Sequence, residues 1–414
     1  MSYIKDLGER AVSAKAKLSA APASKRDSAI LKAAELLVEN ADNILLENTK
    51  DIAAAIQRGI KDAFIERLTL SDSRIAAIAD GLRKITALPD PLGEVIGGGN
   101  LPNGLSVVKK RVPLGVIGII FESRPNVAAD AAGLCLKSGN TVILRGGSDA
   151  IHSNRVITNL FREACIMSGL PADSVILVED TSRDAATALM RLNGYVDVLI
   201  PRGGAGLIKS VVENATVPVI ETGAGNCHVY VDEYADIAKA VSITDNAKKQ
   251  RPSVCNSIES LLVHTNIAST FLPALASVWG DSVEIYGDPE TAAIIHTTRP
   301  VTDEDYYTEY NENKIAVRIV PDIKTAIAHI EKYGTHHSDA IITENFRNAT
   351  EFTEQVQSAA VYVNASTRFT DGYEFGLGAE IGISTQKLHA RGPMGLKELT
   401  TYKYIVTGDG QIRE

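Results

Sequence analysis

The chain has 414 residues, which is enough for two or three domains, and an ordinary globular composition of 45% hydrophobic and 22% charged residues. Its formal net charge of -9 argues against nucleic acid or an anionic membrane surface as a partner. The N-terminus carries acidic residues where a signal peptide needs a basic and then an apolar run, and no stretch approaches the ~20 apolar residues of a membrane span, so we expect a cytoplasmic protein.

The first part of the chain is predicted to be helical. Residues 3–86 are rich in Ala, Leu, Glu and Lys, with apolar residues at helical spacing. The segment GEVIGGGNLPNGLSVVKKRV, at about 93–112, combines glycine-rich turns with a β-rich run and predicts an extended hairpin-like arm. Because a two-stranded arm is not stable alone, it needs the rest of its own domain or a neighbouring subunit.

Residues 114–231 alternate apolar strands with helices, which predicts a parallel sheet covered by helices on both faces. Glycine-rich turns follow two strands, as Arg145-Gly146-Gly147 and Arg202-Gly203-Gly204. Ligands bind at such strand ends in open α/β sheets, although tight packing between strand and helix explains these glycines equally simply. Neither a G-x-G-x-x-G fingerprint nor a P-loop is present in the sequence, so an ordinary Rossmann or kinase-type nucleotide site is not supported.

A helix over 234–250 leads to the segment RPSVCNSIESLLVH, after which strands and helices alternate again and predict a second α/β domain. The last segment, 377–414, contains a short helix and a β-branched strand that could complete a sheet with the arm. We therefore expect one domain over 1–231, a second over 232–376, and a return segment over 377–414.

Cys255 stands at a predicted element boundary, because residues 251–253 break the helix before it and an apolar strand begins at Leu261. Residues at such boundaries are often exposed and functional. Lys248, Lys249 and Arg251 lie just upstream, and nearby positive charge lowers a thiol pKa toward the reactive thiolate. Cys255 is thus a candidate nucleophile, and a buried structural cysteine is the alternative.

The four cysteines show no C-x-x-C pair and no histidine at zinc-ligand spacing, which disfavours a disulfide framework and a structural metal. His336 and His337 have no partner at ligand spacing either. We interpret them as residues of the turn into the following strand, and we expect no metal site.

Five segments identify a family. They are PLGVIGIIFESRPNVAADAAGLCLKSGNTVILRGGSDA (113–150), IPRGG (200–204), ETGAGNCHVYVD (221–232), RPSVCNSIESLLVH (251–264) and VPDIKTAIAHIEKYGTHHSDAIIT (320–343). Because of these segments, the chain resembles the aldehyde dehydrogenase superfamily along essentially its whole length. Within the superfamily it resembles the reductases of glutamyl phosphate. The resemblance implies an α/β fold with a cofactor-binding domain (1–231, with the β arm), a catalytic domain (232–376), and an oligomerisation strand in the return segment (377–414).

The resemblance also implies site residues. Cys255 matches the nucleophile, and Asn126 matches an asparagine whose side-chain amide holds the developing oxyanion together with the Cys255 backbone N–H. Arg145, with Ser148 beside it, suits the 2′-phosphate of NADPH. The cofactor pyrophosphate is matched to the turn Arg202, Gly203 and Gly204, and the nicotinamide ribose to Glu309.

The implied reaction is the NADPH-dependent reduction of L-glutamyl 5-phosphate to L-glutamate 5-semialdehyde and phosphate, the second step of proline biosynthesis. A dianionic leaving group and an α-carboxylate call for cations near the thiol. Lys248 and Arg251 are candidates for the phosphate and Arg368 for the carboxylate, with a solvated surface charge as the alternative for each. The implied partners are copies of the same chain and, transiently, glutamate 5-kinase.

Two other functions stay open. Glu221 occupies the position of the base that activates water in hydrolytic aldehyde dehydrogenases, so the chain could be such an enzyme acting on another small acidic aldehyde. In a reductase Glu221 would be structural, handle protons, or take no catalytic part. An inactive cofactor-binding protein is the other alternative, and the intact Cys255 and Asn126 count against it. We also expect the arm to pair with Tyr402–Thr407 across a subunit boundary, because exposed strand edges need covering.

Overall fold

A computed structural model describes residues 2–60, 62–122 and 124–413. The chain forms two compact units. Unit 1 comprises residues 1–221, 376–382 and 394–414, and unit 2 comprises residues 222–375 and 383–393. The boundary between the first two expected domains therefore falls ten residues earlier than the sequence suggested, after Glu221 instead of after residue 231.

The opening of unit 1 is helical, as predicted. Its amphipathic helices bury one apolar stripe each, for example Ile30, Ala34 and Leu37 in the second helix. Ser71 starts the fifth helix, because its side chain accepts a hydrogen bond from the backbone N–H of Arg74. The five helices are α1 (Ser2–Ser19), α2 (Ala23–Glu39), α3 (Ala41–Gln57), α4 (Asp62–Leu68) and α5 (Asp72–Ala87).

A four-stranded parallel sheet forms the centre of unit 1, in the order β5-β4-β3-β6. Every residue of β3 is buried, as expected for a strand covered on both faces. The strands are β3 (Val116–Phe121), β4 (Thr141–Gly146), β5 (Val175–Leu177) and β6 (Val198–Arg202). The helices that follow them are α6 (Pro125–Lys137), α7 (Ile151–Met167), α8 (Arg183–Met190) and α9 (Ala205–Asn214).

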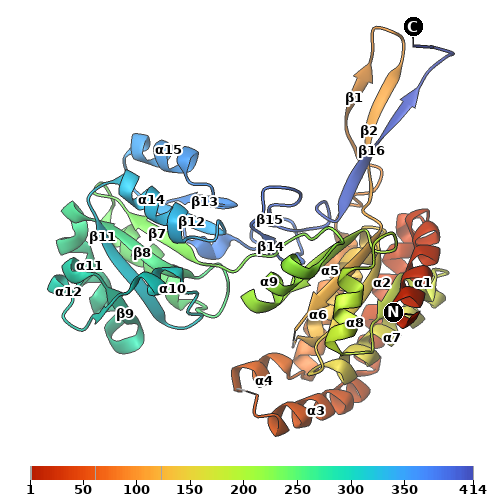
Figure 1. The fold of residues 1–414 in the computed structure, drawn as a ribbon, viewed down its shortest axis with the longest axis horizontal. Helices are drawn as coiled ribbons and strands as arrows, with labels where there is room; N and C mark the ends of the chain where they lie inside the picture. The colour runs from red at the N-terminus through yellow and green to blue at the C-terminus, as the bar shows by residue number, and fades with distance from the viewer. Residues whose placement is uncertain (1, 61, 123, 414) are drawn as a thin grey trace. The chain divides into compact units, whose positions relative to one another are not determined.

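The predicted arm is a three-stranded antiparallel sheet that extends away from the helices of unit 1 (Figure 1). It consists of β1 (Val95–Asn100), β2 (Ser106–Pro113) and β16 (Thr400–Thr407). Gly98 is required there, because its φ is +135° and a Cβ would lie 2.1 Å from the Val107 carbonyl oxygen. Since β16 pairs with β2 of the same chain, the prediction that these strands pair across a subunit boundary is wrong.

Unit 2 contains a seven-stranded parallel sheet in the order β10-β9-β11-β8-β7-β12-β13. Its strands are β7 (Cys227–Val231), β8 (Ile258–His264), β9 (Glu284–Gly287), β10 (Arg299–Pro300), β11 (Lys314–Val320), β12 (Ser338–Ile342) and β13 (Ala360–Val363). Its helices are α10 (Ile237–Lys249), α11 (Thr265–Trp279), α12 (Pro289–Ile294), α13 (Asp303–Tyr307), α14 (Ile323–Tyr333) and α15 (Phe346–Gln355). β7 belongs here because it pairs with β8 and β12, and this explains the earlier boundary.

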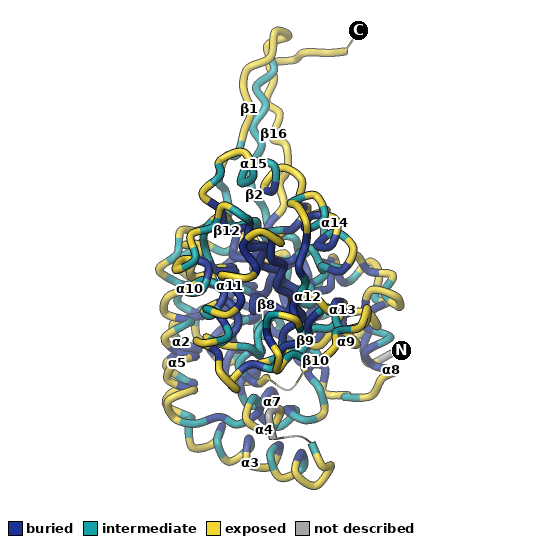
Figure 2. Tube along the Cα trace, turned by 90° about the vertical axis from the view of Figure 1, so that its left-hand side faces the viewer, coloured by how far each residue is buried: buried dark blue, intermediate teal, exposed yellow. Residues whose placement is uncertain are grey.

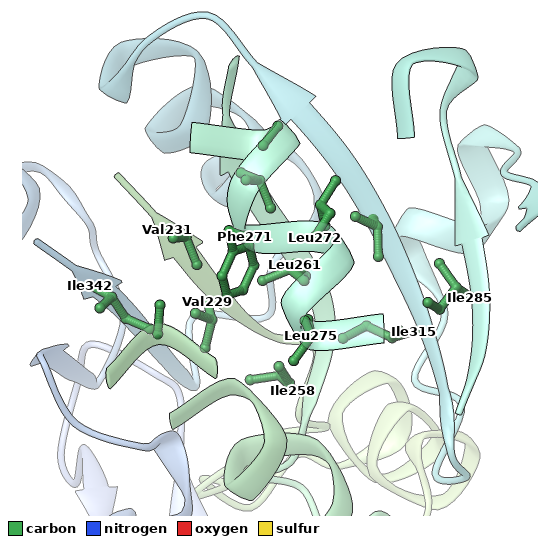
Figure 3. Close-up of a cluster of buried hydrophobic side chains, with 14 of the residues drawn as sticks. Val229, Val231, Ile258, Leu261, Phe271, Leu272, Leu275, Ile285, Ile315 and Ile342 are labelled. Atoms are coloured by element: carbon green, nitrogen blue, oxygen red, sulfur yellow. The ribbon is translucent and has the colours of Figure 1, made fainter. Parts of the chain in front are cut away.

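The core of unit 2 lies between its sheet and α11. Phe271, Leu272 and Leu275 of this helix face Leu261 of β8 and Val229 of β7 (Figure 3). These side chains are at most 1% exposed. Figure 2 shows the contrast between the dark blue strand β8 and the mostly exposed arm. A rigid core directly behind β8 fixes the strand that begins next to Cys255.

The last part of the chain differs from its prediction. In place of a short helix, residues 394–399 form turns that lead into β16, and the short strands β14 (Ile383–Ser384) and β15 (Gly392–Pro393) pair in unit 2. Within the described ranges, no helix is long and apolar enough to cross a membrane.

Candidate active site

Cys255 lies in the turn between α10 and β8, where the sequence placed it, and its side chain is half-buried. The next residue anchors this turn from both sides. Asn256 donates a hydrogen bond from Nδ2 to the Thr370 carbonyl (2.9 Å), and its own carbonyl accepts one from Thr367 Oγ1 (2.6 Å). The turn is therefore fixed while the thiol remains partly accessible.

The loop before β7 lies directly against the carbonyl group of Cys255. A Cβ at Gly225 would lie 1.5 Å from this carbonyl oxygen, so only glycine fits. The Sγ of Cys227 lies 3.1 Å from the same oxygen and donates to it. Glu309 holds the loop in place, since its Oε1 accepts a hydrogen bond from the Gly225 N–H at 2.9 Å.

We expect Gly225→Ala to lower kcat/KM by about 100-fold. The added methyl group must displace the carbonyl of Cys255. A displacement of roughly 1 Å at a reacting residue lowers the rate by about this factor. Initial rates and a thermal melt check this. Gly81→Ala is the matched control, because a Cβ at Gly81 in α5 meets no atom within 4 Å. Rates near wild type for Gly225→Ala would mean that the turn tolerates displacement.

Two of the three predicted cations lie near Cys255. Burial and the positive charge of Arg251 lower the pKa of Arg368, and the negative charge of a Cys255 thiolate raises it. Arg368 is half-buried and donates from Nε to Gln250 Oε1 at 2.8 Å, whereas Arg251 is exposed. These two guanidinium groups give the surroundings of the thiol a positive charge that favours an anionic substrate.

The third cation, Lys248, is buried in an ion pair. Its ammonium is fully buried, 2.7 Å from Glu259 Oε2 and 3.0 Å from the Ile258 carbonyl. Burial lowers the pKa of Lys248 and raises that of Glu259 to about 8, while the attraction within the pair opposes both shifts. A phosphate cannot reach this ammonium, so we leave Lys248 out of the substrate site.

In unit 1, the predicted cofactor residues lie at the carboxyl ends of β4 and β6. Arg145 donates from Nη2 to the carbonyls of Thr181 (2.7 Å) and Ser182 (3.1 Å), which holds its guanidinium at the sheet edge. Ser148 is exposed, and its Oγ accepts a hydrogen bond from Arg58 Nη1 at 3.1 Å. Arg58, at the end of α3, was not identified from the sequence because no local motif links it to a residue 90 positions later.

The turn after β6 shows the exposed backbone that a pyrophosphate needs. Gly203 and Gly204 are exposed, Gly204 precedes α9, and the Gly204 N–H donates to Glu122 Oε2 at 2.9 Å. A cofactor phosphate would have to displace the Glu122 carboxylate from this N–H, so the pyrophosphate role of the turn stays a prediction. Arg202 ends β6 and is half-buried.

Asn126 is the second residue of α6 and donates from Nδ2 to Asp130 Oδ2 at 3.1 Å. Burial raises the pKa of Asp130 to about 6, against this hydrogen bond and the positive charge of Arg202. An amide group carries a second N–H, so the Asp130 contact orients Asn126 without using its whole donor capacity. Asn126 and Glu221 belong to unit 1 and Cys255 to unit 2, so the oxyanion role of Asn126 and the role of Glu221 stay predictions.

Comparison with known proteins identifies relatives of the whole chain. The profile of the aldehyde dehydrogenase family matches residues 2–307. The gamma-glutamyl phosphate reductase of Carboxydothermus hydrogenoformans is 58% identical over 414 residues, which is 100% of both chains. The crystal structure of the gamma-glutamyl phosphate reductase of Thermotoga maritima has a TM-score of 0.97 at 48% identity and covers 99% of this chain and 100% of its own.

A more distant structure shares the fold alone. An acetylating aldehyde dehydrogenase from Geobacillus thermoglucosidasius has a TM-score of 0.70 at 17% identity, and the match covers 100% of this chain and 98% of the other. The two-unit α/β architecture is thus common to enzymes that differ strongly in sequence.

Proposed function

The chain belongs to the aldehyde dehydrogenase family, and we propose that it reduces L-glutamyl 5-phosphate to L-glutamate 5-semialdehyde and phosphate with NADPH. The full-length similarity to gamma-glutamyl phosphate reductases carries the proposal. It places the chain in proline biosynthesis and does not favour a hydrolytic aldehyde dehydrogenase. The half-buried Cys255 beside two arginines fits an enzyme whose substrate is a multiply charged anion.

In this reaction the Cys255 thiolate attacks the acyl carbon of the substrate. A sulfur–carbon bond forms, the carbon–oxygen bond to phosphate breaks, and phosphate leaves with the bonding electron pair. Arg251 binds the departing phosphate and Arg368 the α-carboxylate, while Asn126 donates to the oxyanion. After reduction, the thiohemiacetal collapses to the aldehyde and restores the thiolate.

A nicotinamide cofactor supplies the reducing equivalent when bound, and the strand ends of unit 1 fit its phosphates. Arg145 and Arg58 bring two guanidinium groups to the end of β4 near Ser148, and the exposed Gly203 and Gly204 offer backbone to the pyrophosphate. Two cations at this place favour the extra 2′-phosphate of NADPH over NADH. Glu309 remains a candidate for the ribose, although its carboxylate contacts Gly225 in this structure.

We expect Arg145→Ala to weaken binding of NADPH by at least about tenfold and binding of NADH by much less, because only NADPH offers the 2′-phosphate. Cofactor affinities measured by titration calorimetry test this. Arg155→Ala is the control, since Arg155 lies on α7 and pairs with Glu179 at the surface. Equal losses for both cofactors would remove the 2′-phosphate assignment.

The experiment that tests the whole proposal is the anion requirement of the reverse reaction. Glutamate semialdehyde and NADP should yield NADPH only when phosphate is present to accept the acyl group from Cys255. Arsenate should support continuous NADPH formation, because its acyl ester hydrolyses by itself. Steady turnover in phosphate-free and arsenate-free buffer, with free glutamate as product, would instead assign water activation to Glu221 and make the chain a hydrolytic enzyme.

We also propose that the chain forms a homo-oligomer, since β16 is the edge of the arm and exposes Tyr402, Tyr404 and Val406. Sedimentation as a monomer at micromolar concentration would contradict this. Transient contact with glutamate 5-kinase stays a prediction.

A further inference from the structure

We propose that Cys227 is a positioning residue for the nucleophile, because its buried thiol donates a hydrogen bond to the Cys255 carbonyl and thereby fixes the turn that carries the attacking sulfur. The inference rests on the proposed function in one respect, which is that Cys255 is the attacking thiol.

The fold directs the Cys227 side chain at this carbonyl. Cys227 is the first residue of β7, and the pairing of β7 with β8 shifts register between Cys227 and His228. Cys227 pairs with Ile258 and His228 with Ser260, so Glu259 is the extra residue of a bulge. Bulges re-aim side chains next to functional sites, and this one starts three residues after Cys255.

Cys227 is suited to donate a hydrogen bond and not to react. Its side chain is 0% exposed. Burial raises the pKa of the Cys227 thiol well above its ordinary value, and the negative charges of Asp339 and Cys255 raise it further. His337 Nδ1 also lies 3.6 Å from this sulfur. The thiol therefore keeps its proton at neutral pH.

The hydrogen bond matters because the carbonyl that accepts it lies close to the negative charge of the Cys255 thiolate. The carbonyl of Cys255 is a negative dipole end next to a thiolate, and Gly225 covers its other side too closely for an added methyl group. Without the Cys227 donor, this dipole is poorly compensated and only the Asn256 contacts hold the turn. Both effects raise the energy of the attacking state, whereas residues that bind substrate and cofactor are unchanged. The expected loss is therefore in kcat and not in KM.

Cys227→Ala and Cys227→Ser test the inference, because the serine keeps an O–H donor that the alanine lacks. We expect Cys227→Ala to lower kcat about threefold to tenfold, as for the loss of one neutral hydrogen bond, with both KM values within about twofold of wild type. Cys227→Ser should recover most of the loss. Cys135→Ala, which removes a buried thiol from unit 1, should keep the wild-type kcat.

A second measurement does not depend on turnover. The rate of Cys255 alkylation by iodoacetamide, followed by mass spectrometry without substrate, should fall about threefold in Cys227→Ala and recover in Cys227→Ser. Equal kcat and alkylation rates in the alanine and serine variants, whether both normal or both low, would overturn the inference. If Cys255→Ser itself retained turnover, the proposed function would fail while the alkylation rates would still report on Cys227.

Discussion

Cys255→Ser is expected to leave the chain folded and to lower turnover by at least about 10³-fold. A serine hydroxyl keeps its proton near neutral pH, and it is a poor nucleophile without a dedicated base. The substitution changes one half-buried atom in a turn that Asn256 holds independently, so the fold should not suffer. Initial rates of NADPH oxidation with glutamyl phosphate generated in place give the turnover, and a thermal melt gives the stability.

Cys135→Ser and Cys165→Ser are the controls, because these thiols are buried in unit 1. They should cost stability and leave kcat unchanged. Rates of Cys255→Ser within tenfold of wild type would remove Cys255 from the mechanism. Loss of activity in all three variants, with matching losses of stability, would point to folding and not to chemistry.

Lys248→Met should destabilise the protein by about 3–5 kcal/mol, which is the usual cost of removing one partner of a buried ion pair. The variant leaves the Glu259 carboxyl buried without its cation. Burial already raises the pKa of Glu259 to about 8, and the loss of Lys248 raises it further. A group with a raised pKa in the folded state favours folding at low pH and opposes it as pH rises through that value. The loss should therefore grow from pH 6 to pH 9, as urea titrations at both pH values would show.

Neighbouring residues provide the controls for Lys248. Lys249→Met removes a partly exposed lysine that pairs with Asp245 at 3.4 Å, and it should change stability by less than about 0.5 kcal/mol. The double variant Lys248→Met with Glu259→Leu should recover much of the loss, because two apolar side chains replace the pair. A double variant as unstable as Lys248→Met alone would show that the pair does not account for the effect.

Local pattern was enough to predict most of the secondary structure and the position of Cys255. The helical spacing of residues 3–86 and the apolar strands reflect burial patterns that extend over only a few residues. The glycine-rich turns are equally local, because they are recognised by their residue types. The run RPSVC predicted a turn between α10 and β8 for the same reason. The arm was also predicted from composition, but its partner strand was assigned to another subunit, because sequence does not distinguish pairing within a chain from pairing between chains.

The residues that surround the thiol could not be found in this way. Gly225 and Cys227 reach the Cys255 turn from about 30 residues away, and Glu309 holds Gly225 from more than 80 residues away. The prediction that Lys248 binds the phosphate failed for the opposite reason. It is close to Cys255 in sequence, yet its helix faces β8, and a bulge places Glu259 against it. Proximity along the chain overestimated the role of Lys248, and only the sheet register reveals its partner.

The return of the chain to the arm has a consequence for synthesis on the ribosome. β2 is made early, but its partner β16 emerges about 290 residues later, because Thr400 pairs with Pro113. At roughly 5–20 residues per second, β1 and β2 wait about 15 to 60 s as an unprotected ribbon. A nascent chain stalled before residue 400 leaves the β2 edge open to pairing with any other strand nearby.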